Sequence, residues 1–371
     1  MRRYKKKKLS IRKISYLVIF LVLVTTILIN FNRIITFFQS KITGYEYDTI
    51  TVFHELDVYD DIKKADYSKT LEKVIKTEYY NPKYLKSYLT IEYQENDSFL
   101  KDLNDLLNLG YNSNDINTIY DDLTENSIDI IINNAYLEDI IGLINLSYFK
   151  EDNLERYLKY NQAKTTEERA TYVNALLDYD YYTHVVNIEN PEEITVLVNK
   201  YHKLSSDYVP SDLETISTKY NQGFNNKMRK VAREAFEKMC EAALNDNITI
   251  YSGSAYRSYS YQQTLYNRYV NNNGFDAAET FSARAGYSEH QTGLATDVMN
   301  KQLDFISKND KEYTWLINNS YKYGFILRYP EGKEKITGYM YEEWHFRYVG
   351  VEIAKEIVDL GITYDEYIAR K

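Results

Sequence analysis

Cysteine is nearly absent from this chain of 371 residues, and its scarcity excludes several classes of protein. Cys240 is the single cysteine, so the chain has no intramolecular disulfide, no cysteine-rich zinc cluster and no iron–sulfur site. Proline occurs 4 times and glycine 13 times, too rarely for collagen-like or proline-rich architectures. The hydrophobic share of 44% is too high for a disordered protein, and the length suits about two globular domains.

Acidic residues are missing before Glu46, whereas basic residues are concentrated at the start of the chain. Eight lysines and arginines fall within residues 1–13, and only Arg33 and Lys41 follow before Glu46. Ten of the 45 basic residues therefore precede the body, which carries the remaining 35 against 54 acidic residues, a net charge of −19. Such an acidic body repels a phosphate backbone, so we expect no nucleic-acid binding.

A charge-free apolar run, Ile14–Ile29, follows the basic cluster. Together with the residues after it, this run predicts a transmembrane anchor over residues 14–34. By the positive-inside rule, residues 1–13 form a cytoplasmic tail, and the rest of this single-pass protein of the cell membrane is extracytoplasmic. No small-residue cleavage pattern follows the run, which favours a retained anchor over a signal peptide. A buried helix of a soluble protein would need a polar face, which the run lacks.

Residues 45–201 are rich in Tyr, Asn, Asp, Leu and Ile at helical spacing and contain no glycine-rich loop. The segment Ser98–Tyr111, for example, predicts an amphipathic helix that ends at Gly110, and Ser113 or Asn114 is expected to cap the next helix. We therefore expect an all-α region that serves as a spacer or wall-proximal module and contributes no catalytic group.

Two segments of this region resemble each other. YNPKYLKSYL at Tyr80–Leu89 aligns with FKEDNLERYL at Phe149–Leu158, which places Tyr88 opposite Tyr157. The pair indicates either a duplicated helical module or two ordinary amphipathic helices.

Beyond residue 201 the pattern changes to short strands and helices without regular strand–helix–strand alternation, which favours an α+β domain over residues 205–371. After a linker at 203–213, we expect a helix at 225–245, a strand leading from Ile248 into a Gly/Ser turn, and a helix at 261–270. Further strands are expected in GLATDVM, GFILRYP and EEWHFRYVG, with helices at about 313–323 and 351–360.

Chemistry-bearing residues gather in this second part of the chain. Of the five histidines, His290 lies in SEHQTGLATDV, seven residues before Asp297, and His345 lies in YEEWHFRY. Two imidazoles and one carboxylate are ligand types of a catalytic zinc that leaves a fourth position for water. Taken alone, the spacing leaves open a metal site or buried structural histidines. The remaining three, His54, His184 and His202, lack such neighbours and are interpreted as structural.

The ordered motifs SGSAYRS, YSEHQTGLATDV, GFILRYP and ITGYMYEEWHFRYVG resemble the VanY-type D-alanyl-D-alanine carboxypeptidases. These are zinc peptidases of the hedgehog/DD-peptidase-like fold, and the resemblance covers about residues 205–367. It implies a catalytic domain of that fold with a small antiparallel sheet and a Zn²⁺ cofactor. The site residues implied by the resemblance are His290, Asp297 and His345 as metal ligands, Glu342 as general base, and Arg257, Gln262 and Ser288 for substrate binding.

The sequence departs from the family pattern at Glu343, where a proline is usual. On a regular strand Glu343 would share a face with His345, while Glu342 would point away. Strand periodicity therefore favours Glu343 as the base, and the resemblance favours Glu342, provided that the turn after Gly338 has not yet straightened. The SGSAYRS segment before Arg257 is also longer than the family's usual SGYRS.

The resemblance implies a membrane-anchored zinc metallocarboxypeptidase that removes the C-terminal D-alanine from peptidoglycan stem peptides. Two alternatives remain open. One is an L,D-carboxypeptidase that acts on tetrapeptide stems, and the other is an inactive peptidoglycan-binding protein on the same scaffold.

Overall fold

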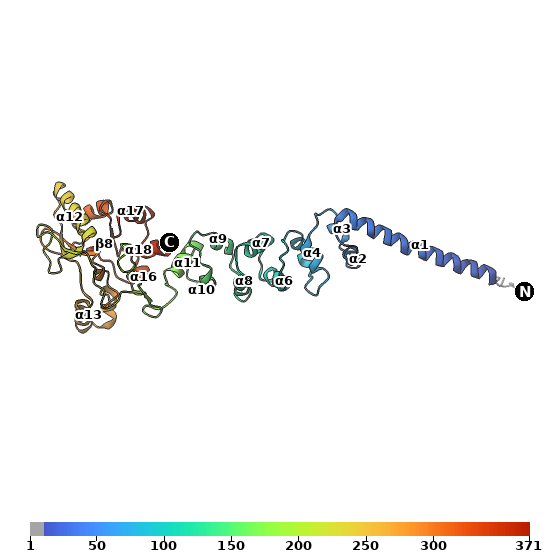
Figure 1. The fold of residues 1–371 in the computed structure, drawn as a ribbon, viewed down its shortest axis with the longest axis horizontal. Coiled ribbons are helices and arrows are strands. Elements are labelled where there is room, and N and C mark those ends of the chain that lie inside the picture. Colours follow the sequence, from blue (N-terminus) through green and yellow to red (C-terminus); the bar gives the residue numbers. More distant parts are fainter. Residues whose placement is uncertain (1–10) are drawn as a thin grey trace, which may run out of the picture. The chain divides into compact units, whose positions relative to one another are not determined.

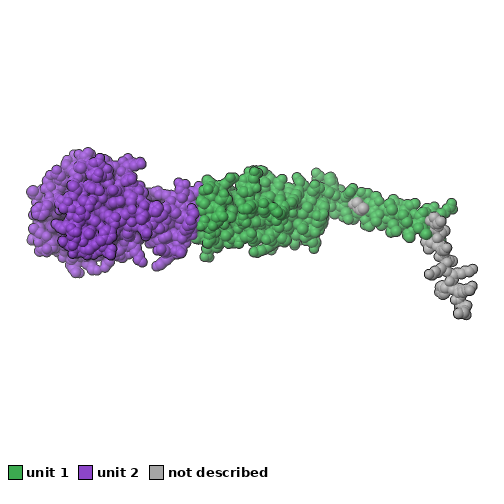
Figure 2. All heavy atoms as spheres, turned by 90° about the horizontal axis from the view of Figure 1, so that it is seen from below, with its two compact units in different colours: residues 1–144 green, residues 145–371 purple. Residues whose placement is uncertain are grey.

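The computed structural model describes residues 11–371 (Figure 1), which form two compact units (Figure 2). One unit reaches to Ile144 and the other comprises Asn145–Lys371. Residues 1–10, most of the expected cytoplasmic tail, lie outside the described residues.

The first unit begins with α1 (Ile11–Thr43), a helix of 33 residues. Many apolar side chains of this helix are exposed; Ile19 and Leu21, for example, are each more than half exposed. By length and composition α1 can cross a membrane, and no part of its most apolar stretch is buried within the described protein. It covers the anchor expected over residues 14–34.

Short helices make up the rest of the first unit. As expected, α6 (Phe99–Leu109) ends at Gly110, whose φ of 116° is the left-handed geometry that glycine adopts most easily. The cap of α7 (Ser113–Asp122) differs from the expectation: Asn112, not Ser113 or Asn114, accepts from the helix N–H groups. Asp115 returns a bond to the backbone N–H of Asn112 and completes a capping box. The other helices are α2 (Tyr47–Glu55), α3 (Tyr59–Ile62), α4 (Lys69–Val74), η1 (Pro82–Tyr84), α5 (Leu85–Tyr88), α8 (Glu125–Ile132) and α9 (Ile140–Ile144).

The two similar segments adopt the same local structure. In the first, Tyr88 donates its hydroxyl to Asn104 at 2.6 Å and accepts from the N–H of Asn81 at 3.3 Å. In the second, Tyr157 donates to Asn174 at 2.6 Å and accepts from the N–H of Lys150 at 3.2 Å. In each copy a short 3₁₀ turn runs into the helix that carries the tyrosine. These matching contacts favour the duplicated module over two unrelated helices.

The second unit combines helices with three small sheets. The two-stranded sheets are β1–β2, which is parallel, and β3–β4, which is antiparallel. The third has the order β5-β6-β8-β7 and is antiparallel throughout, as expected for the catalytic domain. The strands are β1 (Val186–Asn187), β2 (His202–Lys203), β3 (Leu213–Thr215), β4 (Lys227–Arg229), β5 (Tyr251–Ser254), β6 (Ala295–Met299), β7 (Phe325–Leu327) and β8 (His345–Tyr348). The helices are η2 (Glu151–Asn153), α10 (Leu154–Lys159), α11 (Thr166–Asn174), α12 (Lys230–Asn245), α13 (Tyr259–Asn273), α14 (Phe275–Phe281), η3 (Glu289–Thr292), α15 (Lys311–Asn319), η4 (Ser320–Tyr323), α16 (Glu334–Thr337), α17 (Val351–Leu360) and α18 (Tyr364–Ala369).

Two sequence expectations are corrected here. The helix expected from residue 225 begins only at Lys230, because residues 227–229 pair with β3 as strand β4. The region expected to be helical to residue 201 ends its last helix at Asn174, and β1 then pairs with β2. Both differences involve pairing with a strand that lies outside the segment itself, which helical periodicity does not register.

The four-stranded sheet separates the packed core from the candidate site. Val298, Phe325 and Phe346 belong to the core that α12 covers, and Phe236 of α12 lies 6.0 Å from Phe325 between ring centres. Successive side chains of a strand point to opposite faces. The odd-numbered residues of β6 and β8, among them Asp297, therefore lie on the face away from α12.

Candidate active site

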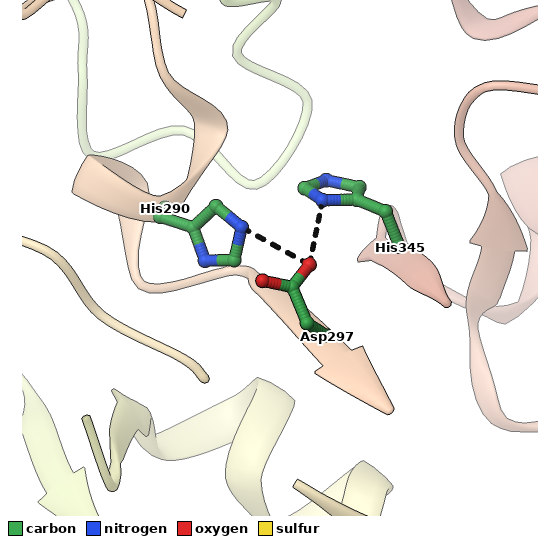
Figure 3. Close-up of side chains that lie close together, drawn as sticks. All are labelled: His290, Asp297 and His345. Carbon is green, nitrogen blue, oxygen red and sulfur yellow. Dashed lines mark hydrogen bonds and ion pairs between the residues drawn. The ribbon is translucent and has the colours of Figure 1, made fainter. Parts of the chain in front are cut away.

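The register of β6 and β8 brings two polar side chains together. Asp297 and His345 are cross-strand partners, a position that places side chains on one face within contact distance. The Oδ1 atom of Asp297 lies 3.1 Å from Nδ1 of His345. A dashed line joins these two side chains in Figure 3. Both side chains are buried, with 7% and 3% of their surface exposed.

His290 approaches the same carboxylate from η3, which precedes β6. Its Nδ1 lies 2.7 Å from the carbonyl oxygen of Ala255, so that nitrogen carries the proton and donates it to the backbone. Its Nε2 is left with a lone pair 3.4 Å from Oδ1 of Asp297. Gly293 ends η3 at φ +66°, and an added Cβ there would lie 2.8 Å from Leu213 Cδ2, so the turn into β6 depends on glycine.

The three side chains fit a metal ion. Their ligand atoms lie within 4.8 Å of one another, and all three residues are buried. The Nε2 atom of His290 is buried and has no hydrogen-bond partner among the described residues, which is costly unless a cation fills the place of the missing donor. Within residues 11–371, no other group of this kind is found. The donor set of two nitrogens and one carboxylate matches the preferences of zinc.

The electrostatics of the cluster agree with this assignment. Burial and the nearby Arg257 lower the pKa of His290 to about 4, so this imidazole is neutral at pH 7. Burial alone would raise the pKa of Asp297, but His290, His345 and Arg257 hold it well below its usual range. Burial would also lower the pKa of His345, but the carboxylates of Asp297 and Glu289 raise it to about 9. The same negative field favours a metal cation in place of that proton.

Glu342 and Glu343 are distinguished by the start of β8. The strand begins only at His345, and residues 343–344 form a turn, so strand periodicity does not extend back to Glu342. Glu342 is 7% exposed and lines the cavity that contains the three candidate ligands, with Oε2 3.8 Å from Nδ1 of His345. Burial raises the pKa of Glu342 to about 8. Glu343 does not line this cavity.

Arg257 reaches into the cavity from the segment after β5. Its Nη1 donates to Ser254 Oγ at 3.0 Å and to Asp297 Oδ2 at 3.2 Å, and its Nε donates to Gln262 Oε1 at 3.0 Å. Gln262 is held in turn by its bond to the carbonyl of Ala283 at 2.7 Å. No partner of the Arg257 Nη2 group is found among residues 11–371, which leaves the N–H groups of this nitrogen free to bind an anion.

The cavity has a volume of about 580 Å³ and unites all the residues that the resemblance implies. Ser288, which is 4% exposed, is part of its wall. The other three histidines lie outside it: His54 contacts Gln39, His184 stacks on Tyr179, and His202 contacts Asn199.

Comparison with known proteins identifies the family. The model of the VanY family, described as D-alanyl-D-alanine carboxypeptidase, matches residues 225–351. The putative carboxypeptidase YodJ of Bacillus subtilis is 40% identical over 192 residues, which cover 49% of this chain and 70% of YodJ. A D-alanyl-D-alanine carboxypeptidase of Enterococcus faecalis is 33% identical over 205 residues, which cover 48% of this chain and 73% of that enzyme. The chain belongs to the VanY family.

Among solved structures, the LdcB LD-carboxypeptidase is 37% identical, with a TM-score of 0.48 over 52% of this chain and 92% of LdcB.

One part of this VanY-family site escaped the sequence analysis. Glu289, Arg328 and Arg347 form a buried charge cluster beside His345, and Asp365 extends it to α18. Two sequence signals point to it. Glu289 directly precedes His290, and Arg347 follows His345 by two residues, which places both side chains on one face of β8. No sequence signal indicates Asp365, because it lies in a helix far along the chain.

Proposed function

We propose that this chain is a zinc-dependent carboxypeptidase that removes the C-terminal D-alanine from peptidoglycan stem peptides. The observation that carries the proposal is the convergence of three metal-ligand atoms in one cavity with a buried glutamate and an arginine. Membership of the VanY family supports the reaction class. In this proposal the second unit carries the DD-peptidase-like catalytic domain.

His290, Asp297 and His345 would hold the zinc through Nε2, a carboxylate oxygen and Nδ1. When bound, zinc lowers the pKa of a water molecule to about 7 and polarises a carbonyl group. His290 is already fixed for this role, because its Nδ1–H is bonded to the backbone.

Glu342 is the proposed general base. It lies beside the candidate ligands, buried, and its pKa is raised by that burial, as suits a group that accepts and returns a proton near neutral pH. After accepting the proton of the attacking water, its carboxyl group can donate that proton to the departing amine of D-alanine.

Arg257 is the proposed clamp for the free carboxylate of the substrate. The Nη2 group of Arg257, which has no partner among residues 11–371, is the nitrogen left to donate to that carboxylate. Gln262 and Ser254 fix two edges of the Arg257 group, so its plane is set before substrate arrives. Ser288 borders the same space. A carboxypeptidase needs such a group, because it must recognise the end of a chain.

The proposal includes a location. α1 serves as a retained membrane anchor, with the basic tail in the cytoplasm and the remainder of the chain outside, where peptidoglycan is found. The helices that follow α1 in the sequence then belong to an extracytoplasmic region.

The test is mass spectrometry of defined stem peptides incubated with the zinc-loaded protein. Release of one D-alanine from a pentapeptide ending in D-Ala-D-Ala supports the proposed activity. Release only from a tetrapeptide replaces it with L,D-carboxypeptidase activity. Absence of any product from a protein shown to contain zinc would contradict both activities and leave the inactive peptidoglycan-binding protein.

A further inference from the structure

The carboxylate of Glu289 lies behind the candidate metal centre and uses its two oxygens differently. Oε1 accepts from Arg328 Nε at 2.7 Å and from Arg347 Nη1 at 3.0 Å. Oε2 lies 3.3 Å from Nε2 of His345. Since two guanidinium groups hold Oε1, the other oxygen of the carboxylate, Oε2, is fixed toward the imidazole.

Burying these charged groups costs free energy, a cost that apolar side chains filling the same space would not have. The side chains of Glu289, Arg328 and Arg347 are fully buried, and taking charges out of water is expensive even when they are paired. Asp365 balances the cluster, with Oδ2 2.6 Å from Arg328 Nη1 and Oδ1 2.8 Å from the side-chain amide of Asn199. Two acidic and two basic groups thus form a neutral, fully bonded set around one imidazole.

The two candidate ligand histidines are oriented by different means. His290 donates Nδ1–H to the backbone carbonyl of Ala255, an acceptor that no side-chain substitution removes. His345 depends for its orientation on a side chain, Glu289. An ionised carboxylate only accepts hydrogen bonds, so Glu289 keeps a proton on Nε2 of His345. Nδ1 lies 3.1 Å from Oδ1 of Asp297, and a metal ion at the proposed site takes the place of a proton between these two atoms, so Nδ1 is the ligand atom.

We propose that Glu289 is a positioning residue of the metal centre: it selects the His345 tautomer that presents Nδ1 to the metal, and Arg328 and Arg347 hold it in that orientation. This inference rests on the proposed zinc site. It assigns no contact with substrate to Glu289, which acts only through His345.

Glu289→Gln tests the inference sharply because it converts an acceptor into a donor at almost unchanged volume. The two arginines have only N–H groups to offer, so they retain the carbonyl oxygen of the new amide. Its NH₂ group then faces Nε2 of His345 and favours the tautomer with the proton on Nδ1, the proposed ligand atom. Zinc binding should weaken by about 10–100-fold, the usual effect of losing a partner behind a ligating histidine.

The experiment measures zinc affinity of the full-length protein by competition with a chromophoric chelator, without reference to activity. The matched control is Glu366→Gln, which also neutralises a buried acid. Glu366 bonds the N–H of Thr363 and Lys333, and no contact joins it to Glu289 or His345 within residues 11–371. The control variant should bind zinc as tightly as the wild type.

A second measurement does not depend on the variant folding. In the zinc-loaded wild type, ¹⁵N NMR should find the His345 proton on Nε2 and the metal on Nδ1. The opposite assignment, or wild-type zinc affinity in a folded Glu289→Gln protein, overturns the inference. A wild type that binds no zinc would instead refute the proposed function, so the two failures are distinguishable.

Discussion

The two copies of the duplicated module, Tyr80–Leu89 and Phe149–Leu158, have the same local structure in different surroundings. In both copies a tyrosine hydroxyl joins an asparagine to the backbone at the start of its own segment. In the second copy, Asn174 also donates to the carbonyl of Ala369 in α18 at 3.0 Å. Arg370, just beyond α18, donates to Thr171 at 3.1 Å. The second module therefore supports the helix that carries Asp365 and the charge cluster.

The two units also differ in the partners of their buried acidic side chains. In the first unit, Glu72 is buried with hydroxyl and backbone partners, among them Thr49 and Tyr67. In the second, Glu289 and Asp365 are buried against guanidinium groups beside a cavity. Burial alone would raise the pKa of Glu289, but Arg328, Arg347 and His345 hold it well below its usual range, and buried groups with strongly shifted pKa values concentrate at functional sites. We therefore expect substitutions to affect catalysis only in the second unit, and the following predictions test that contrast.

Glu342→Gln should have the largest effect. Removing a positioned general base lowers the rate by about 10²–10⁴-fold, with metal content and fold preserved. The matched control is Glu343→Gln, which changes the neighbouring carboxylate outside the cavity and should leave kcat near that of the wild type. Steady-state kinetics on a D-Ala-D-Ala peptide distinguish the two. If Glu343→Gln is the inactive variant and Glu342→Gln is near normal, strand periodicity identifies the base correctly.

Arg257→Ala should have the second-largest effect on catalysis. Losing a hydrogen bond to a charged group costs about 1.5–3 kcal/mol, which corresponds to a fall in kcat/KM of about ten- to a hundredfold. Arg268→Ala is the matched control, because Arg268 lines the same cavity from α13 and should change kcat/KM little. Amidation of the substrate carboxylate should harm the wild type strongly and the Arg257→Ala enzyme hardly at all. Equal harm to both would exclude Arg257 as the clamp.

The sequence predicted the candidate site better than it predicted the limits of the elements around it. The motifs with His290, Asp297 and His345 bring these residues together because strand register and a glycine turn lie within the motifs themselves. The start of α12 could not be found from periodicity, since β4 depends on pairing with β3. Asp365 escaped for the same reason: its partner, Arg328, is distant in sequence, and only the folded chain brings them together.

Phenylalanine substitutions of the paired tyrosines should affect stability and leave kcat/KM unchanged. Tyr88→Phe leaves the buried Asn104 oxygen and the N–H of Asn81 without the hydroxyl, at a cost of about 1–3 kcal/mol. Tyr157→Phe should cost less, because the half-buried Asn174 oxygen keeps its bond from the side-chain amide of Asn153. A chain of two compact units need not unfold in one step, so calorimetry can follow each unit. Tyr88→Phe should lower the transition of the first unit and Tyr157→Phe that of the second. A shift of both transitions by either variant would contradict the contrast.

Deleting the residues before Asn145 should have the smallest effect. The value of kcat/KM on a short soluble peptide should not change measurably, because every residue placed at the site lies in the second unit.

The informative control is a deeper cut before Lys203. That cut removes the carbonyl oxygens of Ile194 and Val196, which accept from Arg347 at 2.9 and 2.8 Å. Two such bonds to a charged group are worth about 3–6 kcal/mol together, a large part of the roughly 5–15 kcal/mol that stabilises a typical domain. The shorter chain should therefore unfold or lose zinc, whereas the chain from Asn145 keeps both. Equal activity of the two chains would show that the segment before Lys203 does not support the site, and loss of activity on the first cut would show that the helical region takes part in catalysis.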